Sequence, residues 1–197
     1  MLPGDVHAGA ELTDHAFDLC QRLLRIDTTN PPGGETVAAE MLAEAGLEPG
    51  VLESAPGRGS VVARLKGKGT KPPLLLTGHL DVVEADPEKW SHPPFSRIVK
   101  DGCLWGRGAI DMKNHCATSV AILTRLAREK VMPERDIIFA GVADEEAVAG
   151  WARSGSAAST RSWSRPSTPS ARVVASISTR PARSSSPSRS PKRASAG

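Results

Sequence analysis

Residues 73–83 read Pro-Leu-Leu-Leu-Thr-Gly-His-Leu-Asp-Val-Val, and the fold of the first 150 residues is decided here. The apolar run at its start is typical of a strand that is covered on both faces of a sheet. His79 and Asp81 follow directly, at the end of a strand where open α/β sheets place their ligands. Residues i and i+2 of a strand face the same way, so the carboxylate can orient an imidazole that binds a metal. Taken alone, a His-x-Asp pair is more often a structural contact.

Helices and short strands alternate on both sides of this run. Three- and four-residue spacing of apolar side chains predicts a helix over residues 12–26, which the Asn30-Pro31-Pro32-Gly33-Gly34 turn ends. Further helices are predicted over 35–45 and 112–130, and strands over 60–65, 73–77, 136–142 and just before Lys100. This alternation predicts an α/β domain with a mostly parallel central sheet flanked by helices.

Two more groups of acids follow predicted elements at chemically useful places. Asp111 lies in the glycine-bearing turn Gly106–Lys113 that opens a helix, where a carboxylate can bridge two cations or cap the helix. Asp144, Glu145 and Glu146 end the strand 136–142, where like charges crowd unless a cation neutralises them. Such acids are usually only solvated charge, but three groups at the ends of successive elements indicate a metal site.

The sequences of these blocks resemble motifs of a known family. GHLDVV (78–83), WGRGAIDMK (105–113) and ADEE (143–146), together with RIDTTNPPGGE (25–35) and WSHPPFS (90–96), are similar to the co-catalytic zinc peptidases and deacylases. That family includes aminoacylase, glutamate carboxypeptidase, acetylornithine deacetylase and succinyl-diaminopimelate desuccinylase. The resemblance covers roughly residues 11–150, with matching spacing and flanking residues at every block.

The resemblance implies a role for each of the five residues. His79 would bind one zinc ion, Asp111 would bridge two, and Glu146 would bind the other, with Co²⁺ or Mn²⁺ as substitutes. Glu145 would act as general base and proton shuttle, and Asp81 would orient His79. The implied reaction is hydrolysis of an amide bond next to a carboxylate, in N-acyl amino acids or short peptides. The implied partner is therefore a small-molecule or peptide substrate with a free carboxylate.

The chain departs from the family pattern after about residue 150. The family has another acid some two dozen residues past the Glu-Glu pair, a histidine near its C-terminus and a dimerising, ferredoxin-like lid domain. Residues 151–197 contain no Asp, Glu or His, and we expect the lid to be absent from this chain. Two zinc ions would then share three ligands, so we expect weak zinc binding and little or no hydrolysis. The alternative is an inactive, truncated remnant without catalytic function.

The segment 151–197 has a composition unlike that of a packed domain. Fifteen of its 47 residues are Ser and five are Pro, which predicts a disordered tail beside the partial metallohydrolase domain of residues 1–150. One interpretation is an arginine- and serine-rich arm that binds nucleic acid. The favoured interpretation is an out-of-frame product, because a GC-rich gene read in a shifted frame yields such a mixture.

Charge and cysteine content bear on the possible partners and on the cellular compartment. The formal net charge is +3, but residues 151–197 contribute +9, which leaves −6 (3 − 9) for residues 1–150. The mild basicity is therefore no nucleic-acid signal for the domain. The three cysteines are scattered and form no CxxC pair, which favours a reducing compartment. We see no apolar stretch of about 18 residues and no signal peptide, so we expect a cytoplasmic protein that is not in the membrane.

The out-of-frame interpretation can be checked on the DNA itself. Sequencing the genomic region from the codon of Ala149 onward is expected to reveal a neighbouring reading frame that continues with acids, a lid and a terminal histidine. A region in which no frame continues in this way would contradict the interpretation and leave the tail as an acquired segment.

Overall fold

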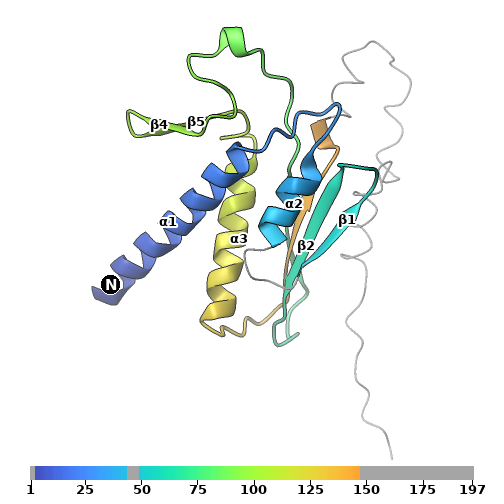
Figure 1. Cartoon of the computed structure of the whole chain (residues 1–197). Helices are drawn as coiled ribbons and strands as arrows, with labels where there is room; N and C mark the ends of the chain where they lie inside the picture. Colours follow the sequence, from blue (N-terminus) through green and yellow to red (C-terminus); the bar gives the residue numbers. More distant parts are fainter. Residues whose placement is uncertain (1–2, 44–48, 147–197) are drawn as a thin grey trace, which may run out of the picture.

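The computed structural model describes residues 3–43 and 49–146 of the chain (Figure 1). The helices are α1 (Pro3–Leu24), α2 (Glu35–Ala43) and α3 (Lys113–Arg128), with a 3₁₀ turn η1 at Pro87–Lys89. The strands are β1 (Gly50–Glu53), β2 (Gly59–Leu65), β3 (Leu74–His79), β4 (Ile98–Lys100), β5 (Cys103–Trp105) and β6 (Ile137–Val142). The predicted end of the second helix, at residue 45, and the predicted tail lie outside the described residues.

The central sheet has the order β1-β2-β6-β3, and β4 and β5 form a separate hairpin. β3 and β6 run parallel, and α3 lies in the crossover between them, as parallel strands require. β2 is antiparallel to both β1 and β6, so the described sheet is mixed. The predicted α/β class is confirmed, whereas the mostly parallel sheet is corrected. The short Ser54–Arg58 connection explains one antiparallel pair, since only antiparallel neighbours can be joined by a tight turn.

The predicted covering of both faces of the strand at residues 73–77 is wrong within the described part of the chain. Leu74 is 42% exposed, and Leu75 and Leu76 are only half-buried. β3 stands at the edge of the described sheet, beside β6 alone, so its first residues have few neighbours. The strand becomes buried only at Gly78 and His79, where α3 packs against it.

One apolar cluster holds the three helices against the sheet. Figure 1 shows α1 beside α3, with the helices on one side of the four-stranded sheet. α1 contributes Leu19, Leu23 and Leu24, and Phe139 of β6 is fully buried beneath the helices. α1 begins nine residues before the predicted start, because the apolar spacing marks only the part of the helix that packs against the core. None of the described helices has the length and apolar character needed to cross a membrane.

A buried lysine joins the carboxyl end of α1 to the start of α3. Lys113 is fully buried, and its Nζ donates to the carbonyl oxygens of Leu23 (3.1 Å) and Ile26 (2.8 Å). The Leu23 carbonyl belongs to the last turn of α1, where helical acceptors have no intrahelical partner. Burial lowers the pKa of Lys113 to about 8, against the smaller opposite effect of nearby Asp27. The side chain therefore acts as a cap supplied by another helix.

We expect Lys113→Ala to destabilise the fold by about 3–5 kcal/mol, because it removes the lysine donor from the carbonyls of Leu23 and Ile26 and creates a cavity. The measurement is the free energy of unfolding in urea. Lys89→Ala is the control, since the Lys89 side chain is 81% exposed and its loss should cost about 0.5 kcal/mol or less. Equal unfolding midpoints for the two variants would contradict the capping role of Lys113.

Candidate metal centre

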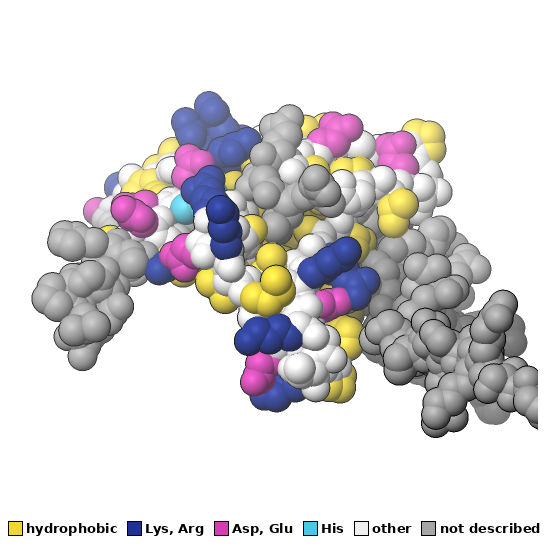
Figure 2. Space-filling model, turned by 90° about the horizontal axis from the view of Figure 1, so that it is seen from below, with side chains coloured by type: hydrophobic (Ala, Val, Ile, Leu, Met, Phe, Trp, Pro, Cys, Tyr) yellow, Lys and Arg dark blue, Asp and Glu magenta, His cyan; other side chains and the backbone are white. Residues whose placement is uncertain are grey.

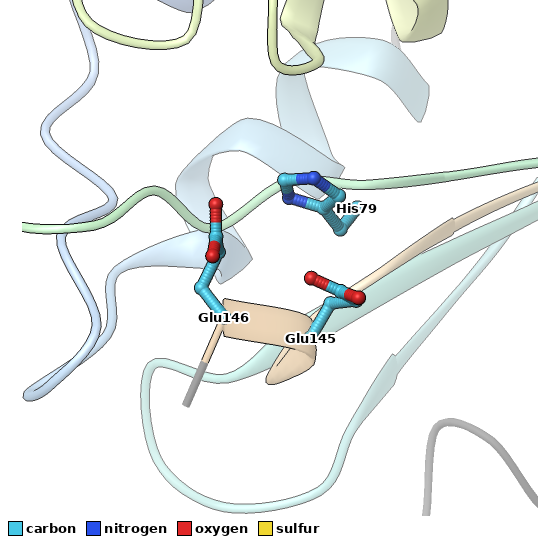
Figure 3. A group of neighbouring side chains, drawn as sticks. All are labelled: His79, Glu145 and Glu146. Atoms are coloured by element: carbon cyan, nitrogen blue, oxygen red, sulfur yellow. The ribbon is translucent and has the colours of Figure 1, made fainter. Parts of the chain in front are cut away.

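The parallel pairing of β3 with β6 brings the predicted site residues to one edge of the sheet. His79 is paired with Val142, so the residues that follow β6 emerge beside the imidazole. His79, Glu145 and Glu146 each offer a ligand atom, and these atoms all lie within 4.8 Å of one another. Figure 3 shows the imidazole on the end of β3 and the two carboxylates on the helical turn after β6. His79 is buried, Glu146 is half-buried and Glu145 is exposed.

The hydrogen bonds of His79 fix which ring nitrogen faces the site. Nδ1 lies 2.9 Å from the backbone carbonyl oxygen of Asp81, which only accepts, so Nδ1 carries a proton. The Asp81 carboxylate is farther from Nδ1, at 3.6 Å, so the backbone carbonyl is the closer partner that orients the ring. Nε2 lies 3.1 Å from Asp111 Oδ1 and is the nitrogen that is available to a metal ion.

Asp111 reaches His79 from the turn before α3. Its side chain is 78% exposed, and it does not cap α3, whose N-cap position is Met112 without any side-chain cap. The turn depends on Gly108, whose φ is +86° and where a Cβ would lie 2.9 Å from Val82 Cγ1. Asp111 contacts His79 but is not within the three-residue group that has all its ligand atoms within 4.8 Å. The structure therefore brings Asp111 to the rim of the group.

Asp81 is fully buried and holds the turn that carries both glutamates. Its Oδ1 accepts the backbone N–H of Glu145 (3.2 Å), and its Oδ2 accepts that of Glu146 (2.8 Å). A carboxylate that accepts the first N–H groups of a helical turn caps it and is favoured by the turn's dipole. The residue predicted to orient His79 thus also positions the backbone of the acid pair.

The charges of this edge are strongly coupled. Burial opposes protonation of His79, but hydrogen bonds to Asp81 and Asp111 outweigh it and raise the pKa of His79 to about 9. Burial raises the pKa of Asp81, yet its hydrogen bonds from His79 and from the Glu146 N–H leave it below the usual range. Burial, with the nearby carboxylates of Asp111 and Glu145, raises the pKa of Glu146 against the effect of His79. One imidazole thus faces an excess of acids.

This donor set fits a divalent transition-metal ion such as Zn²⁺. The described residues at the site offer one imidazole nitrogen with a fixed tautomer and three carboxylates, which are the ligand types that zinc accepts. The crowding that raises the pKa of Glu146 is relieved by a bound cation. His79, Glu146 and, from the rim, Asp111 are therefore the residues that would hold the metal, with the exposed Glu145 carboxylate beside them.

A buried polar network behind the site was missed by the sequence analysis. Asn30 and Glu35 lie in the RIDTTNPPGGE block, to which the sequence analysis assigned a helix stop, a helix start and a likeness to the family but no site residue, and they are 4% and 0% exposed. Asn30 Nδ2 donates to Glu35 Oε1, Asp81 Oδ2 and Asp144 Oδ1 at 3.1–3.3 Å. Arg58 forms an ion pair with the same Asp144 oxygen, Oδ1. The sequence signals were polar residues crowded into a Pro- and Gly-rich turn and the resemblance of this block to the family, and neither names a contact with the site.

The surface of the described residues carries mixed charge on the face shown in Figure 2, where Lys and Arg side chains lie next to Asp and Glu side chains. Two pairs of this kind are Arg64 with Asp136 and Lys71 with Glu134. An interspersed pattern differs from the single-sign stripe typical of nucleic-acid interfaces.

Comparison with known proteins identifies the family. Residues 75–182 match the model of peptidase family M20/M25/M40, so the match includes His79, Asp111 and the acid pair and continues past the described residues. This match spans more than half of the chain. The chain belongs to this family, as the resemblance in the sequence implied.

Curated relatives agree with this assignment. A succinyl-diaminopimelate desuccinylase of Halorhodospira halophila is 41% identical over 113 residues, which cover 55% of this chain and 29% of the relative. The enzyme of the same name from Rhodopseudomonas palustris is 39% identical over 142 residues, which cover 68% of this chain and 36% of the relative. The chain thus spans about a third of the length of the relatives that it matches.

Solved structures show the same fold at low sequence identity. An M20 family metallo-carboxypeptidase from Sulfolobus solfataricus aligns with a TM-score of 0.58 and 19% identity, over 67% of this chain and 31% of that one. Human carnosine dipeptidase 1 aligns with a TM-score of 0.58 and 22% identity, over 70% and 34% of the two chains. The described α/β unit is therefore part of the fold of these metallopeptidases.

We expect the folding stability contributed by His79 to depend on pH when metal is removed with a chelator. Its folded pKa of about 9 lies above the unfolded value near 6.5, so its interactions contribute fully below about pH 6.5. They are lost as the pH rises through about 9. The stability difference between wild type and His79→Gln should fall by about 3 kcal/mol over this range. A difference that stays constant, or an NMR titration midpoint near 6.5 for His79, would contradict it.

Proposed function

We propose that this edge of the sheet is the metal centre of an amide hydrolase that acts on N-acyl amino acids or short peptides. The observation that carries the proposal is the convergence of His79, Glu145 and Glu146 within 4.8 Å, with Asp111 at hydrogen-bond distance from His79. Family membership supports the hydrolase class. The two desuccinylases, at 39–41% identity, support removal of an acyl group from an amino acid as the reaction.

The described residues suit the steps of such a hydrolysis. A divalent cation at this site supplies Lewis acidity toward the scissile carbonyl. Glu145 is the exposed member of the pair, so its carboxylate is free to take a proton from the attacking water and return it to the leaving amine. His79 would offer Nε2 to the metal, because Nδ1 is held by the Asp81 carbonyl. Asp81 keeps both glutamates in place through their backbone N–H groups.

The metal is proposed to be zinc, in up to two ions per site, and held weakly by this 197-residue chain. His79, Asp111 and Glu146 must be shared between two ions, whereas catalytic zinc takes at least three protein ligands. The substrate is proposed to carry a free carboxylate, and the compartment to be the cytoplasm. Three free cysteines fit that reducing compartment.

Zinc titration of the full chain, followed by calorimetry, tests the proposal. We expect saturable binding at one or two equivalents, with His79→Ala weakening the apparent affinity by at least about tenfold because the imidazole that the described residues offer to the site is lost. Glu40→Gln on the exposed face of α2 serves as the control and should bind like wild type.

Activity is the second readout of the same experiment. Any release of acyl group from N-succinyl or N-acetyl amino acids by the zinc-loaded chain should disappear in Glu145→Gln and persist in Glu40→Gln. Zinc affinity that is unchanged by His79→Ala would contradict the assignment of the metal centre, whatever the activity.

A further inference from the structure

The loop between α1 and α2 is bound to the residues that follow β3 like a short additional strand. Thr29 and Val82 form a parallel bridge, the backbone N–H of Asn30 donates to the Val82 carbonyl (3.0 Å), and that of Val82 donates to the Thr28 carbonyl (3.0 Å). The Thr28 hydroxyl donates to the Leu80 carbonyl at 2.7 Å. The Asn30 side chain is thereby delivered to the back of the metal centre, where it is 4% exposed.

At that position a single amide nitrogen serves three buried carboxylates. Nδ2 lies 3.2 Å from Glu35 Oε1, 3.3 Å from Asp81 Oδ2 and 3.1 Å from Asp144 Oδ1. An amide has two N–H groups, so at least one of them is shared between acceptors. The reverse orientation of the amide would place Oδ1 among three acceptors, which is repulsive, and Oδ1 is buried without a hydrogen-bond partner. The site thus demands a donor at Nδ2.

Asp81 is the one carboxylate of the three that reaches the metal centre. The same Oδ2 that accepts from Asn30 accepts the Glu146 N–H at 2.8 Å, and Oδ1 accepts the Glu145 N–H at 3.2 Å. Without the amide, Asp81 would lose the side-chain donor that it shares with Glu35 and Asp144. Like charges in a buried site repel strongly, so the Asp81 carboxylate would have to turn away or be neutralised.

We infer that Asn30 is a positioning residue of the metal centre: its amide holds the Asp81 carboxylate where it accepts the backbone N–H groups of Glu145 and Glu146. The amide acts on the acid pair through Asp81 and touches neither glutamate side chain in the described structure. The inference deepens the proposed function, and rests on it for the meaning of the acid pair. The geometry of the turn itself can be measured without any metal.

Amide hydrogen exchange of the chelator-treated full chain, followed by NMR, is the deciding experiment. We expect Asn30→Ala to speed exchange at the N–H groups of Glu145 and Glu146 by about tenfold beyond any change in global unfolding. Thr28→Val is the matched control, because it removes a buried hydrogen bond of the same loop that goes to a carbonyl and to no carboxylate. It should leave these two N–H groups within about twofold of wild type.

Two results would overturn the inference. One is an exchange rate at Glu145 and Glu146 that Asn30→Ala leaves within about twofold of wild type; the other is an equal acceleration by Thr28→Val. Should Asn30→Ala fail to fold, Asn30→Ser replaces it, since it shortens the side chain and keeps one donor, and the same criteria apply.

Cobalt titration separates this inference from the proposed function. If the wild-type chain gives a saturable Co²⁺ absorption spectrum, Asn30→Ala should shift its midpoint to about tenfold higher cobalt, and Thr28→Val should not. A spectrum that is absent in wild type counts against the proposed function, while the exchange rates still decide the role of Asn30.

Discussion

The parallel register of β3 and β6 is the constraint on which the site depends. Pairing His79 with Val142 makes the two strands end together, so an imidazole and an acid pair that are 66 residues apart in the chain emerge at one edge. A shift of one residue would turn His79 to the opposite face of the sheet. The register is supported by Phe139, which lies fully buried under the helices, and by the crossover through α3. The core packing that supports this register therefore also places the candidate metal ligands.

Burial of acids behind the site is the cost of this arrangement. Glu35, Asp81 and Asp144 are all at least nine-tenths buried, and burial raises the pKa of Glu35 despite the N–H of Gly34 that its carboxylate accepts. The cost is offset by shared donors: the Asn30 amide, the Arg58 guanidinium and the backbone of the Glu145 turn. Such a network is specific because each member loses its partner if another is removed. The network therefore forms a buried layer behind the more exposed carboxylates of Asp111 and Glu145.

Local patterns were enough to predict part of this architecture. His79, Asp111 and the acid pair follow buried or helix-opening segments, and a strand end can be read from a few consecutive residues. The direction of β2 and the exposure of Leu74 could not be predicted from the sequence, because each depends on which strand lies next to it in the sheet. Asn30 was missed for the same reason, since its partner Asp144 lies 114 residues away. The catalytic and ligand roles remain predictions that the proposed experiments test.

The capping of α1 by Lys113 has a consequence for building chimeras between family members. The last turn of α1 and the first residue of α3 form one hydrogen-bonded unit, although nearly 90 residues separate them in the chain. A crossover point placed between these segments would pair a helix end from one parent with a lysine from another. Recombination libraries should therefore inherit both segments from the same parent, whereas the β4–β5 hairpin, whose residues are largely exposed, is a permissive place to exchange sequence.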